Sequence, residues 1–253
     1  MSARSFFRRA RIASQAVKDI ANWREVLPLA ARGKDVTEIR LRTGAVITAP
    51  TEAALWPHFS DIWYHSSYTK YCSIPSGAVV IDIGANVGVF SLFAARLARR
   101  VYALEPASSN FSRLARNVSL TRNVIPLQFA CGARDGEGTL DLSGLPVAFS
   151  LKTLSSAKSE AVNVISLDTL FKRYNIAQCD YLKLDCEGAE FEIILESPAS
   201  LFSNVSRIVM EYHDHLSNGI SHHALAERLR SLGFKTSDYN PNGTHGMMAA
   251  VRA

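Results

Sequence analysis

Apolar positions in the larger, C-terminal part of the chain come in two alternating kinds of segment. The runs 79–83, 101–104, 125–130, 181–184 and 208–212 are short and almost uninterrupted, as is typical of parallel strands that are covered on both faces. Between these runs, apolar residues recur every three or four positions, which predicts helices with one buried face. This order of strand and helix predicts an α/β protein with a mostly parallel, doubly wound sheet.

The residues before this module predict a small N-terminal extension made of helices and a hairpin. Residues 1–33 place apolar side chains on one helical face and basic side chains on the other, so we expect one amphipathic helix that Pro28 kinks or ends. Alternation through 38–48 around a Thr-Gly turn predicts a hairpin. Residues 51–70 read as a helix whose aromatic side chains either pack in the core, which is favoured, or present flat faces to a sugar ring.

Length and composition fit this division. The 253 residues are enough for one large domain with an appendage and too few for two full catalytic domains. We therefore expect an accessory unit at 1–70 and a main domain at 71–253. Hydrophobic residues make up 47% and charged residues 20% of the chain, which excludes disorder, collagen and coiled coils. Charged residues interrupt the most apolar stretch, 78–98, so no membrane span is predicted.

The net charge of +5 belongs to one end of the chain. Residues 1–42 hold ten Lys and Arg against four Asp and Glu, whereas residues 43–253 hold 18 against 19. The main domain is thus near neutral, and we expect no nucleic-acid groove in it. The basic arm either contacts an anionic surface at the periphery of a membrane or packs on the domain as a solvated helix face.

The cysteines and the N-terminus predict a cytoplasmic protein. The four cysteines are scattered and form no C-x-x-C pair, so we expect reduced, partly buried thiols. The basic N-terminus is not followed by the continuous hydrophobic stretch of a secretory signal.

A glycine turn follows the first strand of the main domain, in the run Asp82-Ile83-Gly84-Ala85-Asn86-Val87-Gly88, and Glu105-Pro106 ends the next strand. In a doubly wound sheet, ligands lie across the carboxyl ends of the strands at the switch point. Gly84 permits the tight turn, and Glu105 is placed to accept hydrogen bonds from both ribose hydroxyls, so we expect an adenosine cofactor. Asn86 stands where a dinucleotide fingerprint has its second glycine. This favours S-adenosylmethionine over a nicotinamide dinucleotide, with Asp82 near the methionine ammonium.

Five blocks of the sequence together resemble class I methyltransferases of the FkbM family. These blocks are 80–88, Glu105-Pro106 with Asn110 and Asn117, 165–168, 182–190, and Glu211-Tyr212-His213. The resemblance covers about residues 38–251, and Cys186 stands where the family usually has an aliphatic residue. It implies a Rossmann-like fold, S-adenosylmethionine as cofactor, and O-methylation of sugars, glycans or polyketide products. The residues expected to bind the cofactor are Asp82, Gly84, Ala85, Asn86, Gly88, Glu105 and Pro106.

The carboxyl ends of the fourth and fifth strands carry the candidate catalytic residues Asp185, Glu211 and His213. Methyl transfer to an alcohol requires alignment of oxygen, methyl and sulfur, and a group that takes the hydroxyl proton. An imidazole titrates near neutrality, so we expect His213 to be the base and Glu211, on the same strand face, to orient it. Asp185 either lies beside the methionine end or the acceptor, or caps the next helix. Lys183 is expected to pair with a carboxylate, and Glu190 only to favour the helix dipole.

The acceptor is expected to be a hydroxyl of a small molecule or glycan, first of all a sugar, glycan or glycosylated natural product. We expect 51–71 and the irregular segment 133–163 to select it. We expect no metal ligands. A competing hypothesis is a divalent ion held by Asp185, Glu211, His213 and His215, which assists methylation of a polyketide or another small-molecule hydroxyl. Less favoured hypotheses are a nicotinamide-dependent oxidoreductase and a catalytically silent cofactor-binding module. The sequence does not fix the oligomeric state.

Overall fold

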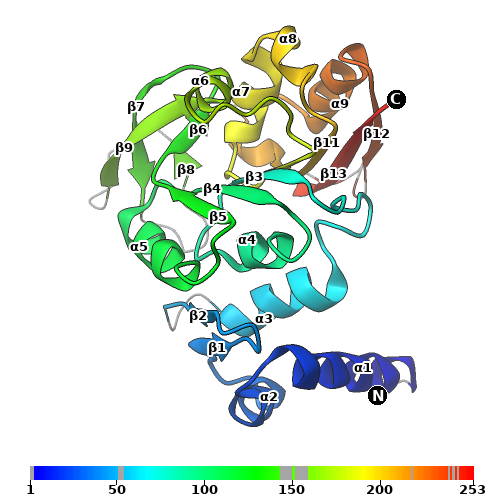
Figure 1. The fold of residues 1–253 in the computed structure, drawn as a ribbon. Coiled ribbons are helices and arrows are strands. Elements are labelled where there is room, and N and C mark those ends of the chain that lie inside the picture. The colour runs from blue at the N-terminus through cyan, green and yellow to red at the C-terminus, as the bar shows by residue number, and fades with distance from the viewer. Residues whose placement is uncertain are drawn as a thin grey trace.

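The computed structural model describes residues 3–50, 54–142, 150–151, 159–217, 219–238, 240, 243 and 245–253. Its centre is a seven-stranded sheet in the order β12-β13-β11-β10-β3-β4-β5 (Figure 1). The parallel strands are β3 (Val79–Ile83), β4 (Arg100–Leu104), β5 (Val124–Leu127), β10 (Tyr181–Leu184) and β11 (Arg207–His213). Two antiparallel strands, β13 (His245–Arg252) and β12 (Phe234–Asp238), extend the sheet beyond β11. The predicted mostly parallel sheet is confirmed.

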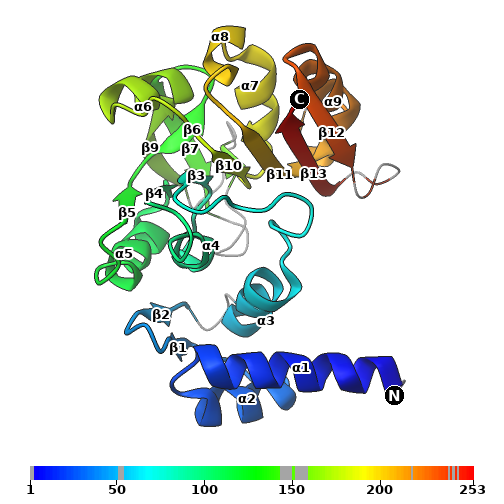
Figure 2. The same ribbon diagram turned by 45° about the vertical axis from the view of Figure 1, so that its right-hand side comes forward.

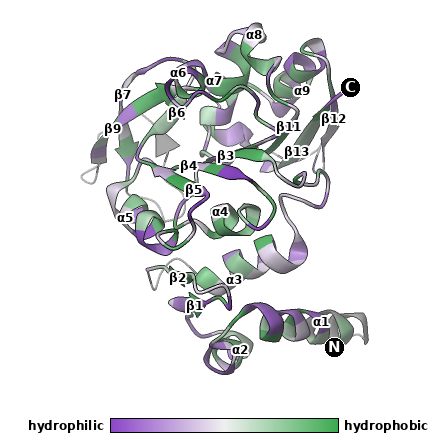
Figure 3. Ribbon diagram, viewed as in Figure 1, coloured by the Kyte–Doolittle hydropathy of each residue, from purple (hydrophilic) through white to green (hydrophobic). Residues whose placement is uncertain are grey.

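Helices cover both faces of this sheet (Figures 1 and 2). One face carries α4 (Val89–Ala94) and α5 (Ser108–Asn117). The other carries α6 (Leu167–Arg173), α7 (Ala189–Glu196), α8 (Ala199–Phe202) and α9 (His222–Ser231). Side chains of β3 alternate between the two cores, since Val80 packs with the first set and Ile81 with the second. Figure 3 shows hydrophobic residues along these strands.

The order of the strands fixes where a ligand can bind. The chain begins the sheet at β3, adds β4 and β5 on one side, and then returns to add β10 and β11 on the other. The connections from β3 and β10 therefore leave in opposite directions, which opens a crevice at their carboxyl ends.

A second, four-stranded sheet corrects the prediction that residues 133–163 are irregular. It contains β6 (Ala130–Gly132), β7 (Gly136–Asp141), β8 (Ser150–Leu151) and β9 (Ser159–Ser166), with β7 and β9 antiparallel. Its own core is small, with Leu140 and Val162 packed against Ala107 and Ala130. So few buried positions leave little apolar alternation for a sequence pattern to reveal. The remainder of that predicted segment lies outside the described residues.

The N-terminal extension begins with two helices, not the single helix that was predicted. These are α1 (Ala3–Asp19) and α2 (Trp23–Ala31), and Pro28 lies inside the second. The first helix ends before Pro28 because the backbone at its end hydrogen-bonds with the hairpin. The N–H of Ala21 donates to the carbonyl of Arg40 at 2.6 Å. Asn22 accepts the N–H of Arg40 through its side chain at 2.9 Å. Tertiary hydrogen bonds thus end α1 before the proline.

The rest of the extension packs on α4 and α5. The predicted hairpin is confirmed as β1 (Glu38–Arg40) and β2 (Val46–Thr48), followed by α3 (Leu55–Ser60) and the π-helical turn η2 (Asp61–His65). The expected core role of the aromatics is confirmed for Phe59 and Trp63, which are buried in one cluster with Val89. The N-terminal extension and the main module share this core. The division of the chain into two units at residue 70 therefore stays a prediction. Among the described residues, no helix has both the length and the apolar character needed to cross a membrane.

Candidate active site

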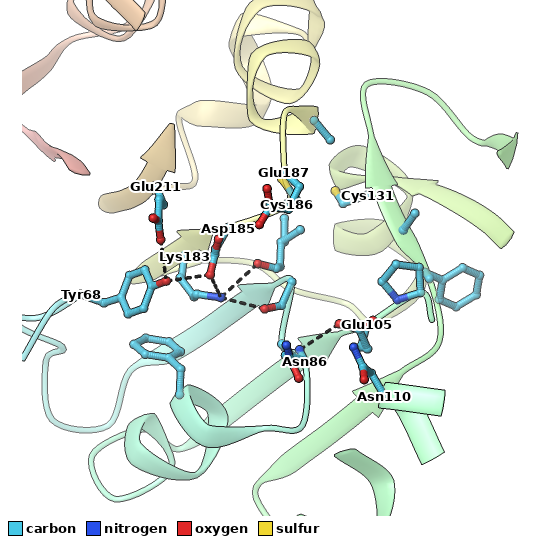
Figure 4. Close-up of a pocket in the computed structure, with 18 of the residues that line it drawn as sticks. Tyr68, Asn86, Glu105, Asn110, Cys131, Lys183, Asp185, Cys186, Glu187 and Glu211 are labelled. Carbon is cyan, nitrogen blue, oxygen red and sulfur yellow. Dashed lines mark hydrogen bonds and ion pairs between the residues drawn. The ribbon is translucent and has the colours of Figure 1, made fainter. Parts of the chain in front are cut away.

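A pocket opens at the predicted crevice, at the carboxyl ends of β3, β4, β10 and β11 (Figure 4). Residues of the main module line most of it, and the extension closes one side. The extension contributes His58, Asp61, Ile62 and Tyr68. The main module contributes, among others, Gly84, Ala85, Asn86, Glu105, Pro106, Asn110, Phe129, Lys183, Asp185, Glu187 and Glu211.

The turn after β3 explains why glycine stands at residue 84. Gly84 has φ +75°, and a Cβ at this position would overlap the backbone carbonyl of Asp185. Asn86 also has a positive φ, of 50°, and Gly88 has φ +90° with Leu114 directly against its Cα. The first turn of the module therefore touches the end of β10, and the pocket floor has no room for a side chain there.

Glu105 is held by backbone donors beneath the pocket. Its carboxylate accepts the N–H of Asn86 at 2.9 Å and that of Ala107 at 3.0 Å, and the residue is only 5% exposed. Burial raises the pKa of Glu105 to about 7, although these backbone hydrogen bonds oppose the shift. Figure 4 shows Glu105 beside Asn86 and Asn110. The carboxylate is thus positioned to accept hydrogen bonds from a vicinal diol such as a ribose.

The structure places Asp82 beneath the pocket and not on its surface. Asp82 is fully buried, accepts the hydroxyl of Ser91 at 2.6 Å and pairs with Lys183 Nζ at 3.0 Å. Contact between Asp82 and a methionine ammonium is therefore not supported, because the fully buried carboxylate already faces Lys183. The predicted pairing of Lys183 with a carboxylate is confirmed.

Lys183 supplies one positive charge that faces the carboxylates of both Asp82 and Asp185. Its Nζ lies 3.6 Å from Asp185 Oδ2 and donates to the carbonyl of Gly84 at 2.9 Å. Burial alone would lower the pKa of Lys183, but the two carboxylates raise it. Burial alone would raise the pKa of Asp185, but the charge of Lys183 and a hydrogen bond from Tyr68 lower it. Asp185 is therefore an ionised carboxylate on the pocket wall.

Tyr68 brings the N-terminal extension to the strand ends. Its hydroxyl donates to Asp185 Oδ2 at 2.7 Å and lies 3.4 Å from Glu211 Oε2 (Figure 4). Burial and the nearby carboxylates raise the pKa of Tyr68 well above its ordinary value, so the phenol remains a donor. The sequence indicated an aromatic ring that packs in the core or faces a sugar, and not this hydrogen bond, since the contact spans 117 residues along the chain.

Glu190, and not Glu211, orients His213. Glu190 is fully buried, and its Oε1 lies 3.0 Å from both the Nδ1 and the backbone N of His213. Glu211 instead lies 2.6 Å from His245 Nε2. This corrects the predicted orienting role of Glu211 and the interpretation of Glu190 as a helix-dipole residue only. The turn at Gly188, with φ +104°, directs Glu190 inward beneath β11.

The environment of His213 does not favour a neutral imidazole. Burial alone would lower its pKa, but the hydrogen bond and charge of Glu190, with the charges of Glu187 and Asp185, raise the pKa of His213 to about 9. A protonated imidazole cannot accept a proton, so the geometry does not support His213 as a base at neutral pH. The carboxylates that line this end of the pocket are those of Asp185, Glu187 and Glu211.

All four cysteines are free, as predicted. Cys72, Cys131 and Cys179 are buried, and Cys186 is half-buried on the pocket wall. Burial and the charge of Glu190 raise the pKa of the Cys186 thiol well above its ordinary value, so it is a poor nucleophile.

Comparison with known proteins gives the family. The model of the methyltransferase FkbM domain matches residues 82–236. The chain is 26% identical over 188 residues to methyltransferase sdnD of Sordaria araneosa, covering 58% of this chain and 73% of that protein. It is 27% identical over 136 residues to hexuronic acid methyltransferase AglP of Haloferax volcanii, covering 53% and 56%. With 31-O-demethyl-FK506 methyltransferase FkbM of Streptomyces tacrolimicus, the identity is 23% over 217 residues, covering 71% and 83%.

A solved structure shows the same fold. Methyltransferase FkbM from Methylobacillus flagellatus KT superposes with a TM-score of 0.50 at 12% identity, over 76% of this chain and 47% of that one. The family match, the strand order and the pocket at the switch point agree. The chain belongs to the FkbM family of class I methyltransferases, whose methyl donor is S-adenosylmethionine.

Proposed function

We propose that the protein transfers a methyl group to a hydroxyl oxygen, and that the acceptor is a sugar, a glycan or a glycosylated natural product. The observation that supports this is the set of hydrogen-bond acceptors at one end of the pocket, where Asp185, Glu187 and Glu211 come together. Carboxylates accept hydrogen bonds, and an acceptor rich in hydroxyls supplies the matching donors. The relatives include a hexuronic acid methyltransferase and a 31-O-demethyl-FK506 methyltransferase, which fits a hydroxyl acceptor.

The residues around Gly84 fit an adenosine cofactor. Glu105 would accept the ribose hydroxyls, and the turn at 84–86 with Pro106 would contact the nucleoside on either side. The absence of a Cβ at Gly84 lets the turn lie directly against the backbone carbonyl of Asp185, so the cofactor end of the pocket adjoins this residue. The cofactor supplies an electrophilic methyl group. The proposed cofactor-binding set keeps Ala85, Asn86, Gly88, Glu105 and Pro106, and gives Asp82 the indirect role of holding Lys183.

Asp185 is the proposed proton acceptor. A bound cofactor would supply the methyl group and leave as the thioether, and Asp185 would take the proton of the attacking hydroxyl. Lys183 and Tyr68 hold this carboxylate ionised and fix its orientation. Glu211, which shares the hydroxyl of Tyr68, is proposed to orient the acceptor.

The test is a radiolabelled methyl-transfer screen against glycan and metabolite extracts of the producing cell. Product whose label is lost on cleavage of a methyl ether supports O-methylation. With an acceptor in hand, we expect Asp185→Asn to lower kcat by about 10²–10⁴-fold, with the S-adenosylhomocysteine Kd much less affected. Unchanged turnover in Asp185→Asn would remove this role, and transfer to nitrogen or carbon only would refute O-methylation. Cofactor binding without transfer to any acceptor would favour the catalytically silent module.

The affinity for S-adenosylhomocysteine is expected to depend on pH through Glu105. The pKa of Glu105 is about 7, and the ionised carboxylate accepts hydrogen bonds from ribose hydroxyls more strongly than the neutral acid does. Binding should therefore strengthen as pH rises through 7 and weaken below it, by about tenfold between pH 8 and pH 6. Calorimetric titration at several pH values measures this. Glu105→Gln, which cannot ionise, should bind more weakly and with no such slope; equal slopes for both proteins would contradict the assignment.

Two predictions about the setting stay open to test. A cytoplasmic location is predicted from the free thiols. Peripheral contact of the basic arm, including Lys18 on α1, with an anionic surface is predicted from its charge. Salt-sensitive binding to vesicles of anionic lipid that vanishes when residues 1–33 are deleted would support the second.

A further inference from the structure

We propose that Glu211, His213 and His245 bind one divalent first-row transition-metal ion at the edge of the pocket. This inference deepens the proposed function and rests on it for what the ion does to the acceptor. The site itself is argued only from the positions of these side chains.

The sheet register brings the three side chains together. Glu211 and His213 are alternate residues of β11 and so project from the same face. His245 begins β13 and is the direct partner of His213 across the antiparallel ladder. One ligand atom from each residue lies within 4.8 Å of the others, and the two imidazole rings have centroids 5.5 Å apart. Donor atoms bound at about 2.1 Å to one ion lie roughly 3–3.5 Å apart, so small side-chain adjustments suffice.

Glu190 already holds His213 as a metal ligand is usually held. Metal-bound histidines donate the N–H that faces away from the metal to a carboxylate, which fixes the ring and the tautomer. Here the fully buried carboxylate of Glu190 lies 3.0 Å from Nδ1. The opposite nitrogen, Nε2, belongs to a ring that is only 7% exposed, and Glu187 Oε2 stands 3.7 Å from it, beyond hydrogen-bond distance. Nε2 therefore faces the carboxylates, and a metal ion bound there would take the place of its proton.

The local charge also favours a cation. Asp185, Glu187 and His213 form a second group whose ligand atoms lie within 4.8 Å of one another. The carboxylates of Asp185, Glu187, Glu190 and Glu211 thus surround one imidazole. A divalent ion would offset part of this negative charge. Two imidazoles and a carboxylate suit Zn²⁺, Mn²⁺, Fe²⁺ or Co²⁺ better than Mg²⁺ or Ca²⁺.

The structure changes the ligand set that the metal hypothesis drew from the sequence. His215 is exposed and belongs to neither group of converging ligand atoms among the described residues. Its place is taken by His245, which lies 32 positions beyond His213 in the sequence but opposite it in the sheet.

The position of the ion indicates the class of acceptor. Glu211 lines the pocket, so the coordination positions left open by the protein face the acceptor. An ion there would polarise the acceptor hydroxyl, whose proton still passes to Asp185. Two adjacent oxygens, as in a vicinal diol or a hydroxy acid, could occupy two open positions together. We therefore expect acceptors that chelate.

The test is a titration of the metal-free protein with Mn²⁺. The electron paramagnetic resonance signal of free Mn²⁺ measures how much of the ion is bound. We expect one ion bound per chain, displaced by Zn²⁺, and an affinity at least tenfold lower in His245→Ala and Glu211→Gln. His215→Ala is the matched control, because it removes a neighbouring histidine outside the proposed set, and it should bind like the unaltered chain. Circular dichroism shows whether each variant is folded. Failure to bind Mn²⁺, or binding that His245→Ala and Glu211→Gln leave unchanged, would overturn the proposal.

This experiment needs neither cofactor nor acceptor, so it separates the two proposals. Mn²⁺ binding at these residues without methyl transfer to any hydroxyl would leave the metal site standing and refute the proposed function. Methyl transfer at full rate by a chain that binds no Mn²⁺ would refute the metal site alone.

Discussion

Gly84→Ala is expected to lower the free energy of unfolding by about 3 kcal/mol or more and to abolish measurable cofactor binding. Two costs combine at this position. The left-handed backbone conformation is unfavourable for alanine, and its Cβ would collide with the carbonyl of Asp185, which is backbone at the end of a buried strand. Relief requires β3 and β10 to move apart at the point where the cofactor binds. Urea denaturation and calorimetric titration with S-adenosylhomocysteine measure the two effects.

Gly77→Ala is the matched control for this substitution. Gly77 has φ +74°, almost the same as Gly84, but no heavy atom lies within 4 Å of the Cβ position. It should therefore show the conformational cost alone, about 1 kcal/mol, with cofactor binding intact. Equal destabilisation by the two substitutions would mean that the contact between the turn and Asp185 is not a close one.

Lys183→Met is expected to cost about 3–5 kcal/mol of unfolding free energy, because it leaves the fully buried Asp82 carboxylate without its cation. The contrast is Lys172→Met. Lys172 pairs with Asp168 at an even shorter distance, 2.6 Å, but both side chains are largely exposed. Solvent screens such a pair, so its loss should cost no more than about 0.5 kcal/mol.

A double variant separates the buried charge from the packing of the lysine stem. In Asp82→Asn with Lys183→Met, the fully buried carboxylate is removed together with its cation and only Asp185, on the pocket wall, loses a partner, so part of the stability should return. Chemical denaturation of the unaltered protein, of each single variant and of the double variant gives the coupling energy between the two positions. A double variant no more stable than Lys183→Met would show that the methylene stem of Lys183, and not its charge, holds this part of the core.

The sequence predicted the parts of the fold whose signals are local. The apolar run of β3, the glycine turn and Glu105 at the end of β4 were enough to place the cofactor end of the pocket. The sequence pattern gave wrong predictions where contacts with a distant segment determine the local structure. The break between α1 and α2 depends on hydrogen bonds of Ala21 and Asn22 with the backbone of Arg40, and the pairing of β7 with β9 buries too few residues to produce a visible period.

The catalytic end was less predictable for the same reason. His213 was singled out by its place at a strand end, but its partner Glu190 comes from the next element, behind a turn that only the backbone conformation of Gly188 explains. Tyr68 and His245 reach the same edge from the extension and from the last strand. Spacing along the chain carries no information on such contacts. The polar residues at the strand ends did indicate the position of the site in the fold.

The hydrogen bond from Tyr68 to Asp185 also limits how this enzyme can be redesigned by exchange of parts. A chimaera that replaces the first 70 residues, in order to change the acceptor, exchanges a hydroxyl that touches the proposed proton acceptor. A graft that supplies phenylalanine at this position would alter the chemistry together with the selectivity. The useful splice point therefore lies before Tyr68, so that the recipient keeps its own tyrosine.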